Sequence, residues 1–297
     1  MKLNVFNEVR NNKIRSFFIM SFFIVLIGII GGALGVFYDN FYFGLIIAII
    51  AAIIYTLIVF NSGDLMILKL SKAKEATKAD YPYLFHTIEG LAIAANIPKP
   101  KAYVIEDESL NAFATGKDPK KASICVTTGL LKKLNRQELE GVIAHEMSHV
   151  KNYDIRVMML TAVLVGITVL LSNFLIRSFM FGSGGNKDSK NNVGIVLLIV
   201  GFVLAILTPV FAELIKLAIS RKREYMADAS AAVLTRYPPG LASALEKIKD
   251  STPMKNPNKA TAHLFINSPF KKTKGFVSNL FSTHPPIEER IRRLRAM

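Results

Sequence analysis

The sequence predicts an integral membrane protein with four transmembrane helices and one α+β domain outside the bilayer. Two observations support this fold class. Hydrophobic residues make up 51% of the 297 residues, which is high for a soluble globular chain. These residues also gather in four long apolar runs. The runs leave roughly 200 residues elsewhere, enough for one compact domain with its own core.

The first two apolar runs predict a transmembrane hairpin. Residues 1–16 are polar and net basic, and residues 17–37 and 41–60 follow without a charged residue apart from the turn between them. Each run is long enough to cross a bilayer core of about 30 Å as a helix. A basic start before an apolar run also fits a secretory signal peptide. The length of the run and the second span directly after it favour a retained hairpin instead.

The first part of the α+β domain is expected at residues 61–156. Helical periodicity covers residues 80–97, while residues 101–105 and 123–127 have the composition of strands. A further strand is expected within 109–116, where the alternation of apolar and polar residues is weaker.

A second transmembrane hairpin is predicted from the third and fourth apolar runs, residues 157–176 and 193–212. Residues 213–297 then complete the domain, with a helix near 240–248 and a basic terminal helix that begins near Pro286. The second hairpin is therefore inserted into the sequence of the domain.

The distribution of charge indicates which side of the membrane the domain occupies. The start of the chain is net positive, the 38–40 turn is net negative, and residues 221–223 are all basic. Because basic residues favour the cytoplasmic side, we expect the domain and both termini in the cytoplasm. The 177–192 loop disagrees mildly with this orientation, because it is also basic but would lie outside the cell if the third and fourth runs both span the membrane. The single cysteine, Cys125, cannot form an internal disulfide, which suits a reducing compartment.

The net charge of +15 has two explanations. A nucleic-acid-binding protein is one, but the sequence has no aromatic-and-basic RNA motif and no basic recognition helix. Many of the basic residues flank the apolar runs instead, where they can contact anionic head groups. We therefore expect the lipid bilayer, and no nucleic acid, as the partner of this charge.

A metal-binding motif is predicted on the helix that begins after Asn135. Asn135 and Glu138 have the spacing of a capping box. The helix then carries an H-E-x-x-H motif formed by His145, Glu146 and His149. Positions four apart share one face of a helix, so both imidazoles can reach one zinc ion. With five histidines in the chain, chance would produce about 0.004 such matches.

Glu146 has the position of a general base. It follows the first histidine directly and so points to the side of the metal. From there its carboxylate can take a proton from zinc-activated water and later deliver it to a leaving amine. This chemistry predicts a zinc-dependent endopeptidase.

A catalytic zinc site needs a third protein ligand besides the two histidines. No histidine follows His149 at the spacing of the extended motif, and His86 and His263 lie in contexts typical of surface or core residues. The best candidate is Glu224, four residues before Asp228 on a predicted helix. One of this pair can bind zinc while the other holds a ligand imidazole. Without the H-E-x-x-H motif, such a pair would more often mark a solvated helix face.

Four motifs together resemble the HtpX family of membrane-bound zinc proteases. They are the H-E-x-x-H segment, EYMAD at 224–228, NAFATG at 111–116 and STHPP at 282–286. The resemblance covers nearly the whole chain, including both apolar hairpins. It implies a role in bacterial heat-shock stress response and protein quality control, in the inner or plasma membrane of a bacterium or archaeon. The family is distantly related to the CaaX prenyl protease.

The resemblance also implies the details of the site. A thermolysin-like (gluzincin-like) core would bind one Zn²⁺ per subunit, with Glu224 as third ligand and Asp228 as its support. His284 and Arg290 would lie near the zinc, where either could stabilise the oxyanion of the tetrahedral intermediate. His284 could equally form a turn before the terminal helix. Asp154 matches a family position whose role is structural or catalytic.

A substrate-binding strand is the last feature that the resemblance implies, formed by Asn111, Ala112, Phe113 and Ala114 at an edge of the sheet. An edge strand offers backbone N–H and C=O groups to an extended peptide, which binds as an added strand. Such binding is largely independent of sequence, as cleavage of misfolded or damaged membrane proteins requires.

Two alternatives to a quality-control endopeptidase remain at this stage. A CaaX-type prenyl-protein protease would use the same chemistry on lipidated tails, although that enzyme encloses its site in a larger intramembrane chamber. A non-catalytic zinc-binding membrane scaffold would keep the metal, but it would be expected to lose Glu146 first. The sequence carries no signal for the oligomeric state.

Overall fold

The computed structural model describes most of the chain, namely residues 5–36, 39–164, 166–167, 221–258, 260–270 and 285–297. The second predicted hairpin lies mostly outside these residues, although residues 154–164 at its start are helical. His284 also lies outside them.

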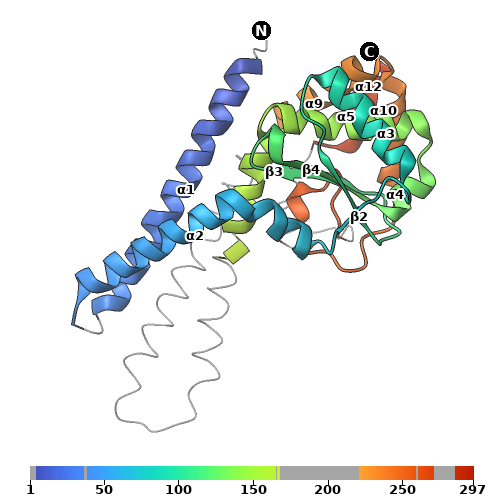
Figure 1. Ribbon diagram of the computed structural model, residues 1–297. Coiled ribbons are helices and arrows are strands. Elements are labelled where there is room, and N and C mark those ends of the chain that lie inside the picture. The colour runs from blue at the N-terminus through green and yellow to red at the C-terminus, as the bar shows by residue number, and fades with distance from the viewer. Residues whose placement is uncertain (1–4, 37–38, 165, 168–220, 259, 271–284) are drawn as a thin grey trace.

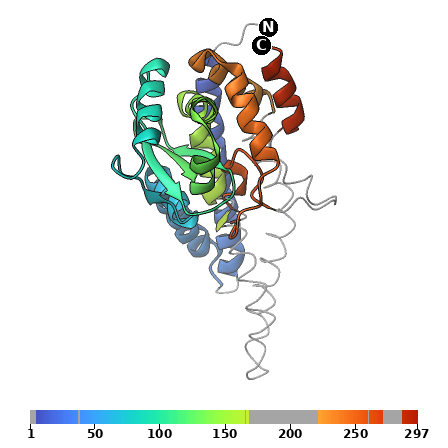
Figure 2. The ribbon, with the colours of Figure 1, turned by 90° about the vertical axis from the view of Figure 1, so that its right-hand side faces the viewer.

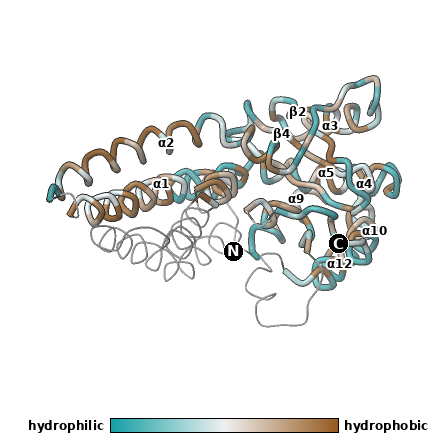
Figure 3. The backbone as a smooth tube through the Cα atoms, turned by 90° about the horizontal axis from the view of Figure 1, so that it is seen from below, coloured by the Kyte–Doolittle hydropathy of each residue, from teal (hydrophilic) through white to brown (hydrophobic). Residues whose placement is uncertain are grey.

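An N-terminal hairpin is formed by α1 (Val5–Val36) and α2 (Phe41–Leu70). Both helices are long and apolar enough to cross a membrane, over 29 residues in α1 and 30 in α2. Large apolar side chains of α2, including Ile46, Ile50 and Leu57, are exposed in the protein alone. Figure 3 shows that hydrophobic residues run along most of the hairpin, away from the domain. This surface suits contact with lipid.

The two helices are longer than the predicted spans. α1 begins at Val5 rather than near residue 17, so its polar first turns are also helical. Asn12 and Ser16 are buried in this part, although they precede the apolar run. α2 continues through Asn61 and Asp64 and ends only at Leu70. The predicted spans are therefore the parts of the two helices nearest the turn between them, and both helices continue beyond these parts to reach the domain.

Small residues allow close packing within the hairpin. A Cβ atom at Gly31 would lie 2.0 Å from the Cβ of Ala48 on the other helix, which no pair of atoms can tolerate. Glycine at this position therefore lets the two backbones approach closely, as is common between transmembrane helices.

The domain contains a four-stranded sheet with the order β1-β2-β4-β3. Its strands are β1 (Lys74–Glu75), β2 (Lys101–Ile105), β3 (Ala112–Gly116) and β4 (Ala122–Thr127). The two inner strands, β2 and β4, are parallel, and β3 pairs antiparallel with β4. The strands expected at 101–105, 109–116 and 123–127 are therefore confirmed, and β3 lies at an edge of the sheet.

Helix α5 is central among the helices of the domain. These helices are α3 (Pro82–Ala95), α4 (Thr128–Lys133), α5 (Arg136–Lys151), α9 (Arg221–Thr235), α10 (Pro238–Lys249) and α12 (Ile287–Arg295). α5 contacts α3, α9 and α10 as well as strand β3 (Figure 1). It therefore lies between the sheet and the C-terminal helices, and twelve of its residues are buried.

The start of α5 is held by the predicted capping box. The side chain of Asn135 accepts a hydrogen bond from the Glu138 backbone N–H, and the Glu138 carboxylate accepts one from the Asn135 N–H. Lys247 of α10 also donates to the Glu138 carboxylate, at 2.7 Å. The same carboxylate thus caps α5 and connects it to α10.

The N-terminal end of α1 lies on the same side of the molecule as the C-terminal helix of the domain. In Figures 1 and 2 the start of α1 and the helix α12 lie toward one end of the molecule. The turn between α1 and α2 lies away from that end. The polar beginning of α1 is therefore on the same side of the hairpin as the domain.

Candidate metal centre

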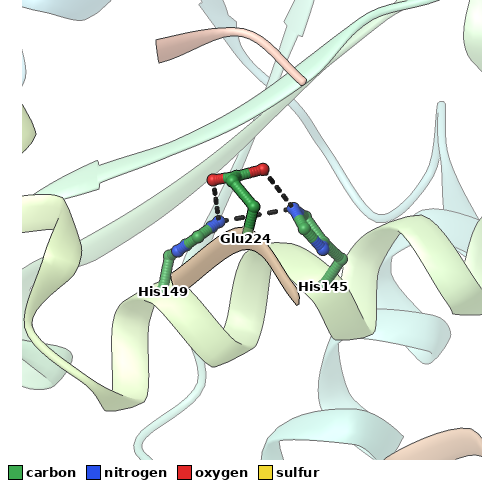
Figure 4. A group of neighbouring side chains, drawn as sticks. All are labelled: His145, His149 and Glu224. Carbon is green, nitrogen blue, oxygen red and sulfur yellow. Dashed lines mark hydrogen bonds and ion pairs between the residues drawn. The ribbon is translucent and has the colours of Figure 1, made fainter. Parts of the chain in front are cut away.

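Two helices bring three metal-binding side chains together. His145 and His149 lie one turn apart on α5, and Glu224 from the first turn of α9 faces them (Figure 4). All three are buried, and one donor atom from each lies within 4.8 Å of the others. Among the residues that the structure describes, this is the one group of this kind.

The distances within this triad fit a tetrahedral metal site. The two histidine Nε2 atoms are 3.3 Å apart. Glu224 places one carboxylate oxygen 3.5 Å from His149 Nε2 and the other 3.7 Å from His145 Nε2. Ligand atoms at about 2.1 Å from a tetrahedral zinc ion lie about 3.4 Å from one another. Each pair of side chains therefore approaches to near this spacing, with Glu224 using a different oxygen toward each histidine.

Two further carboxylates hold the histidine rings by their other nitrogens. Asp228 Oδ1 lies 3.0 Å from His145 Nδ1, and Asp154 Oδ2 lies 3.0 Å from His149 Nδ1. An ionised carboxylate only accepts hydrogen bonds, so Nδ1 of each ring carries the donated proton. The Nε2 lone pairs are then directed at the centre of the triad, as metal ligation needs.

Arg290 of α12 contacts Asp228, His145 and Glu224. Its Nε and Nη2 donate to the two oxygens of Asp228 at 2.9 and 2.7 Å. Nη2 also lies 3.4 Å from both ring nitrogens of His145, and Nη1 lies 3.7 Å from Glu224. The structure thus places Arg290 beside the candidate metal-binding side chains, with its two shortest hydrogen bonds directed at the Asp228 carboxylate.

The charge of the buried site suits a divalent cation. Four buried carboxylates, those of Glu146, Asp154, Glu224 and Asp228, surround the triad. Two buried guanidinium groups oppose them, from Arg290 and from Arg223, which bonds Asp154 at 3.0 Å. With neutral histidines, the side chains that the structure describes leave two net negative charges in a region where an uncompensated charge is costly. A doubly charged metal ion neutralises them.

The pKa values in the site respond to the same negative charge. Burial lowers the pKa of His149, but the Asp154 hydrogen bond and the charges of Glu224 and Glu146 outweigh it and raise that pKa to about 9. Burial raises the pKa of Asp228, whereas Arg290 and His145 together lower it to about 2. Asp228 is therefore ionised at neutral pH, and the site favours any cation near His149.

Glu146 lies on α5 between the two histidines and is buried. Its negative charge contributes to the raised pKa values of His149 and Arg290, so it lies within electrostatic reach of both sides of the site. On β4, burial raises the pKa of the Cys125 thiol, and Glu146 adds to that effect. The charge of Glu146 thus acts on the triad and on β4, the strand that pairs with β3.

Strand β3 lies close to the metal centre but is not open along its length. Ala112 directs its C=O away from β4, and the Ile266 N–H donates to it at 3.0 Å. The Asn111 side chain bonds the backbone N–H and C=O of Asn267, and the rings of Phe113 and Phe265 meet at 5.0 Å. We call residues 265–267 the edge segment, since it occupies the start of the outer side of β3.

The model of peptidase family M48 matches residues 78–297, which contain the domain described above apart from strand β1. The chain belongs to peptidase family M48. Its candidate metal-binding triad thus lies in a metallopeptidase, and the scaffold alternative does not apply.

Curated members similar to this M48 chain carry the name predicted from the four motifs. A protein named "Protease HtpX homolog" from Dictyoglomus thermophilum is 49% identical over 293 residues, covering 98% of this chain and 94% of its own length. Another of that name from Limosilactobacillus reuteri is 42% identical over 297 residues, covering 99% and 100%. The resemblance to the HtpX family is confirmed. The chain is a membrane-bound metalloprotease.

A solved structure of another protein has the same fold. The crystal structure of S. mikatae Ste24p matches 91% of this chain with a TM-score of 0.53 and 20% sequence identity. The M48 chain spans 62% of the length of that protein. At this level of identity the likeness concerns the fold.

Two residues of the site were not predicted. Arg223 is basic and follows an apolar run, so its charge indicated membrane orientation, whereas the structure shows it buried against Asp154. Asn12 precedes the first apolar run, yet it donates to Asp154 at 2.8 Å. Helical spacing could have indicated Asn12, because it lies four residues before buried Ser16 and on the same face as buried Ile19.

Proposed function

We propose that the chain is a zinc-dependent endopeptidase whose metal ligands are His145, His149 and Glu224. The observation that carries the proposal is the buried triad, in which each pair of side chains approaches to between 3.3 and 3.7 Å. The surplus of two buried negative charges among the described residues of the site supports a divalent ion. Imidazole and carboxylate donors in a tetrahedral arrangement favour zinc.

A zinc ion in such a site polarises a peptide carbonyl and makes a water molecule acidic enough to attack at neutral pH. The residues of the chain supply the rest. Glu146 accepts the proton of the attacking water and delivers it to the leaving amine. Asp154 and Asp228 keep both imidazoles in the ligating tautomer. Arg290 holds Asp228 and adds positive charge beside His145, where an oxyanion would develop.

The test separates metal binding from proton transfer. Glu146→Gln and Glu146→Ala should keep bound zinc, yet cleave an unfolded protein such as casein about 100- to 10,000-fold more slowly. Glu140→Gln is a matched control, because Glu140 lies on the same helix and pairs at the surface with Arg136. Cleavage by either Glu146 variant at the parental rate would exclude Glu146 as the base.

Substrate is proposed to bind as an added strand along β3. Side chains alternate along a strand, and so do the directions of its backbone groups, so Ala114 shares the outward direction of Ala112. A peptide paired here would pass close to α5 and the metal centre, since α5 contacts β3. The edge segment occupies part of this side, so we propose that an extended substrate displaces it.

The substrates are proposed to be misfolded or damaged membrane proteins. Backbone pairing with β3 would accept many sequences, and the hairpin keeps the domain beside the bilayer. The basic start of α1 lies on the side of the domain, and Lys13 lies over the Tyr153 ring at 5.1 Å. We therefore propose a cytoplasmic active site, with residues 157–176 and 193–212 as two further spans.

A direct test of substrate class compares two probes with the purified enzyme. We expect cleavage of an unfolded protein at many positions, and no preference for a peptide with a prenylated C-terminal tail over its unmodified counterpart. Preferential cleavage of the prenylated peptide would instead support a CaaX-type enzyme.

A further inference from the structure

Asn12 of α1 is a fully buried polar residue whose side chain is completely hydrogen-bonded. Its Nδ2 donates to the Asn152 carbonyl at 2.9 Å and to Asp154 Oδ1 at 2.8 Å. Its Oδ1 accepts from Arg223 at 3.0 Å and from Arg15 at 3.2 Å. An amide has two N–H donors and two acceptor positions, so this one is used to capacity.

The partners of Asn12 determine how its amide is oriented. Reversal of the amide would turn its oxygen toward the Asp154 carboxylate and its N–H groups toward the Arg223 guanidinium. Both contacts would then be repulsive. The site accordingly requires a donor on one side and an acceptor on the other, which among side chains of this size only asparagine provides.

Asp154 connects this amide to the metal centre. Its Oδ2 holds His149 Nδ1 at 3.0 Å, and its Oδ1 receives Asn12 and Arg223 at 2.8 and 3.0 Å. A carboxylate can fix the direction of an imidazole only if the carboxylate itself is held. Asn12 and Arg223 hold it from α1 and from α9, the helix that also carries Glu224.

We propose that Asn12 is a positioning residue of the metal centre. It fixes Asp154, and Asp154 fixes the ring of His149, so the membrane hairpin forms part of the zinc site as well as its anchor. The proposal rests on zinc ligation by His149. Outer hydrogen-bond partners of metal ligands typically change metal affinity by about 10- to 100-fold when they are removed.

A purely structural role for Asn12 predicts a different outcome. Burial of a hydrogen-bonded amide between α1 and the domain would then stabilise the fold without affecting the metal. Asn11 provides a matched control, because it is the same residue type one position earlier on α1 and is only half-buried. The described residues include no hydrogen-bond partner of the Asn11 side chain.

The experiment uses the full-length protein in detergent. Zinc affinity is measured by competition with a chromophoric chelator, and ligand geometry by the visible spectrum of the Co²⁺-loaded protein. Asn12→Ala should weaken zinc binding about 10- to 100-fold and alter the Co²⁺ spectrum. Asn11→Ala should leave both unchanged. Asn12→Ser retains a polar group and provides a second test if the alanine variant does not fold.

A double-variant cycle tests whether Asn12 acts through Asp154. In an Asp154→Asn background, Asn12→Ala should weaken zinc binding far less than it does in the parent, because the two residues act in one network. Equal effects in both backgrounds would overturn the proposal. So would a folded Asn12 variant with the zinc affinity and Co²⁺ spectrum of the parent.

His149→Ala distinguishes this proposal from the proposed function. If His149→Ala keeps its full zinc content, the ligand assignment itself is wrong, and the role of Asn12 fails with it. If His149→Ala loses zinc while both Asn12 variants bind it normally, the zinc site stands and only the positioning role is overturned.

Discussion

Arg290 and Asp228 form a buried, two-bonded ion pair that connects α12 to α9, with N–O distances of 2.9 and 2.7 Å. Asp228 also holds His145, so the last helix of the chain supports the first ligand of the metal triad. Burial lowers the pKa of Arg290, but Asp228, Glu224 and Glu146 raise it above its ordinary value. Arg290 therefore remains charged in the interior.

The pair predicts a large effect when one partner is removed. Arg290→Met leaves the buried Asp228 carboxylate without its cation and should destabilise the zinc-free protein by about 3–5 kcal/mol. Unfolding in excess chelator measures this without a contribution from metal. Arg290→Met combined with Asp228→Asn should recover part of the loss, and an unchanged stability of the single variant would contradict the prediction.

Glu224 should be required for zinc itself. Glu224→Ala removes one of three protein ligands, so we expect the purified variant to contain much less zinc than the parent, measured by metal analysis. Glu140→Ala, which changes a half-exposed glutamate on α5, should retain the parental content. Normal zinc stoichiometry in Glu224→Ala would remove Glu224 from the ligand set.

The edge segment should compete with substrate for β3. Ile266→Pro removes the N–H that bonds Ala112, and Phe265 already has the extended backbone that precedes a proline, with φ −73° and ψ 141°. Loss of one hydrogen bond, about 1 kcal/mol, should lower KM for an unfolded substrate about fivefold. Ile266→Ala is the control, because it removes apolar contact but keeps the N–H. Equal KM values for the two variants would argue against competition.

Close packing of α5 on α10 should make Gly141 irreplaceable. A Cβ atom there would lie 2.7 Å from the backbone N of Leu241 and 2.8 Å from its Cα. Gly141→Ala should therefore destabilise the domain by about 1–3 kcal/mol. Gly90→Ala, at an exposed position of α3 where a Cβ would meet nothing within 4 Å, should instead stabilise it by up to about 1 kcal/mol. Thermal unfolding measures both effects: the midpoint temperature should fall for Gly141→Ala and rise for Gly90→Ala.

The sequence by itself determined the features that depend on neighbours along the chain. Residues four apart on a helix must share a face, which predicted that His145 and His149 bind one metal ion. The capping box at Asn135, the strands of the sheet and the two N-terminal spans follow from equally local patterns of polarity. Glu224 required more, since it was inferred from the missing third ligand and from resemblance.

Only the tertiary structure decided which distant residues bond to one another around the site. Asn12 and Asp154 are 142 positions apart, and Asp228 and Arg290 are 62 apart. Nothing in the local pattern of a polar residue specifies such a partner, because the pairing depends on how α1, α9 and α12 pack around α5. The same holds for Ile266, whose backbone N–H bonds Ala112 on the edge strand β3. No local pattern could identify residue 266 as the neighbour of that strand. Local periodicity thus predicted the ligands on α5, and packing determined what holds them.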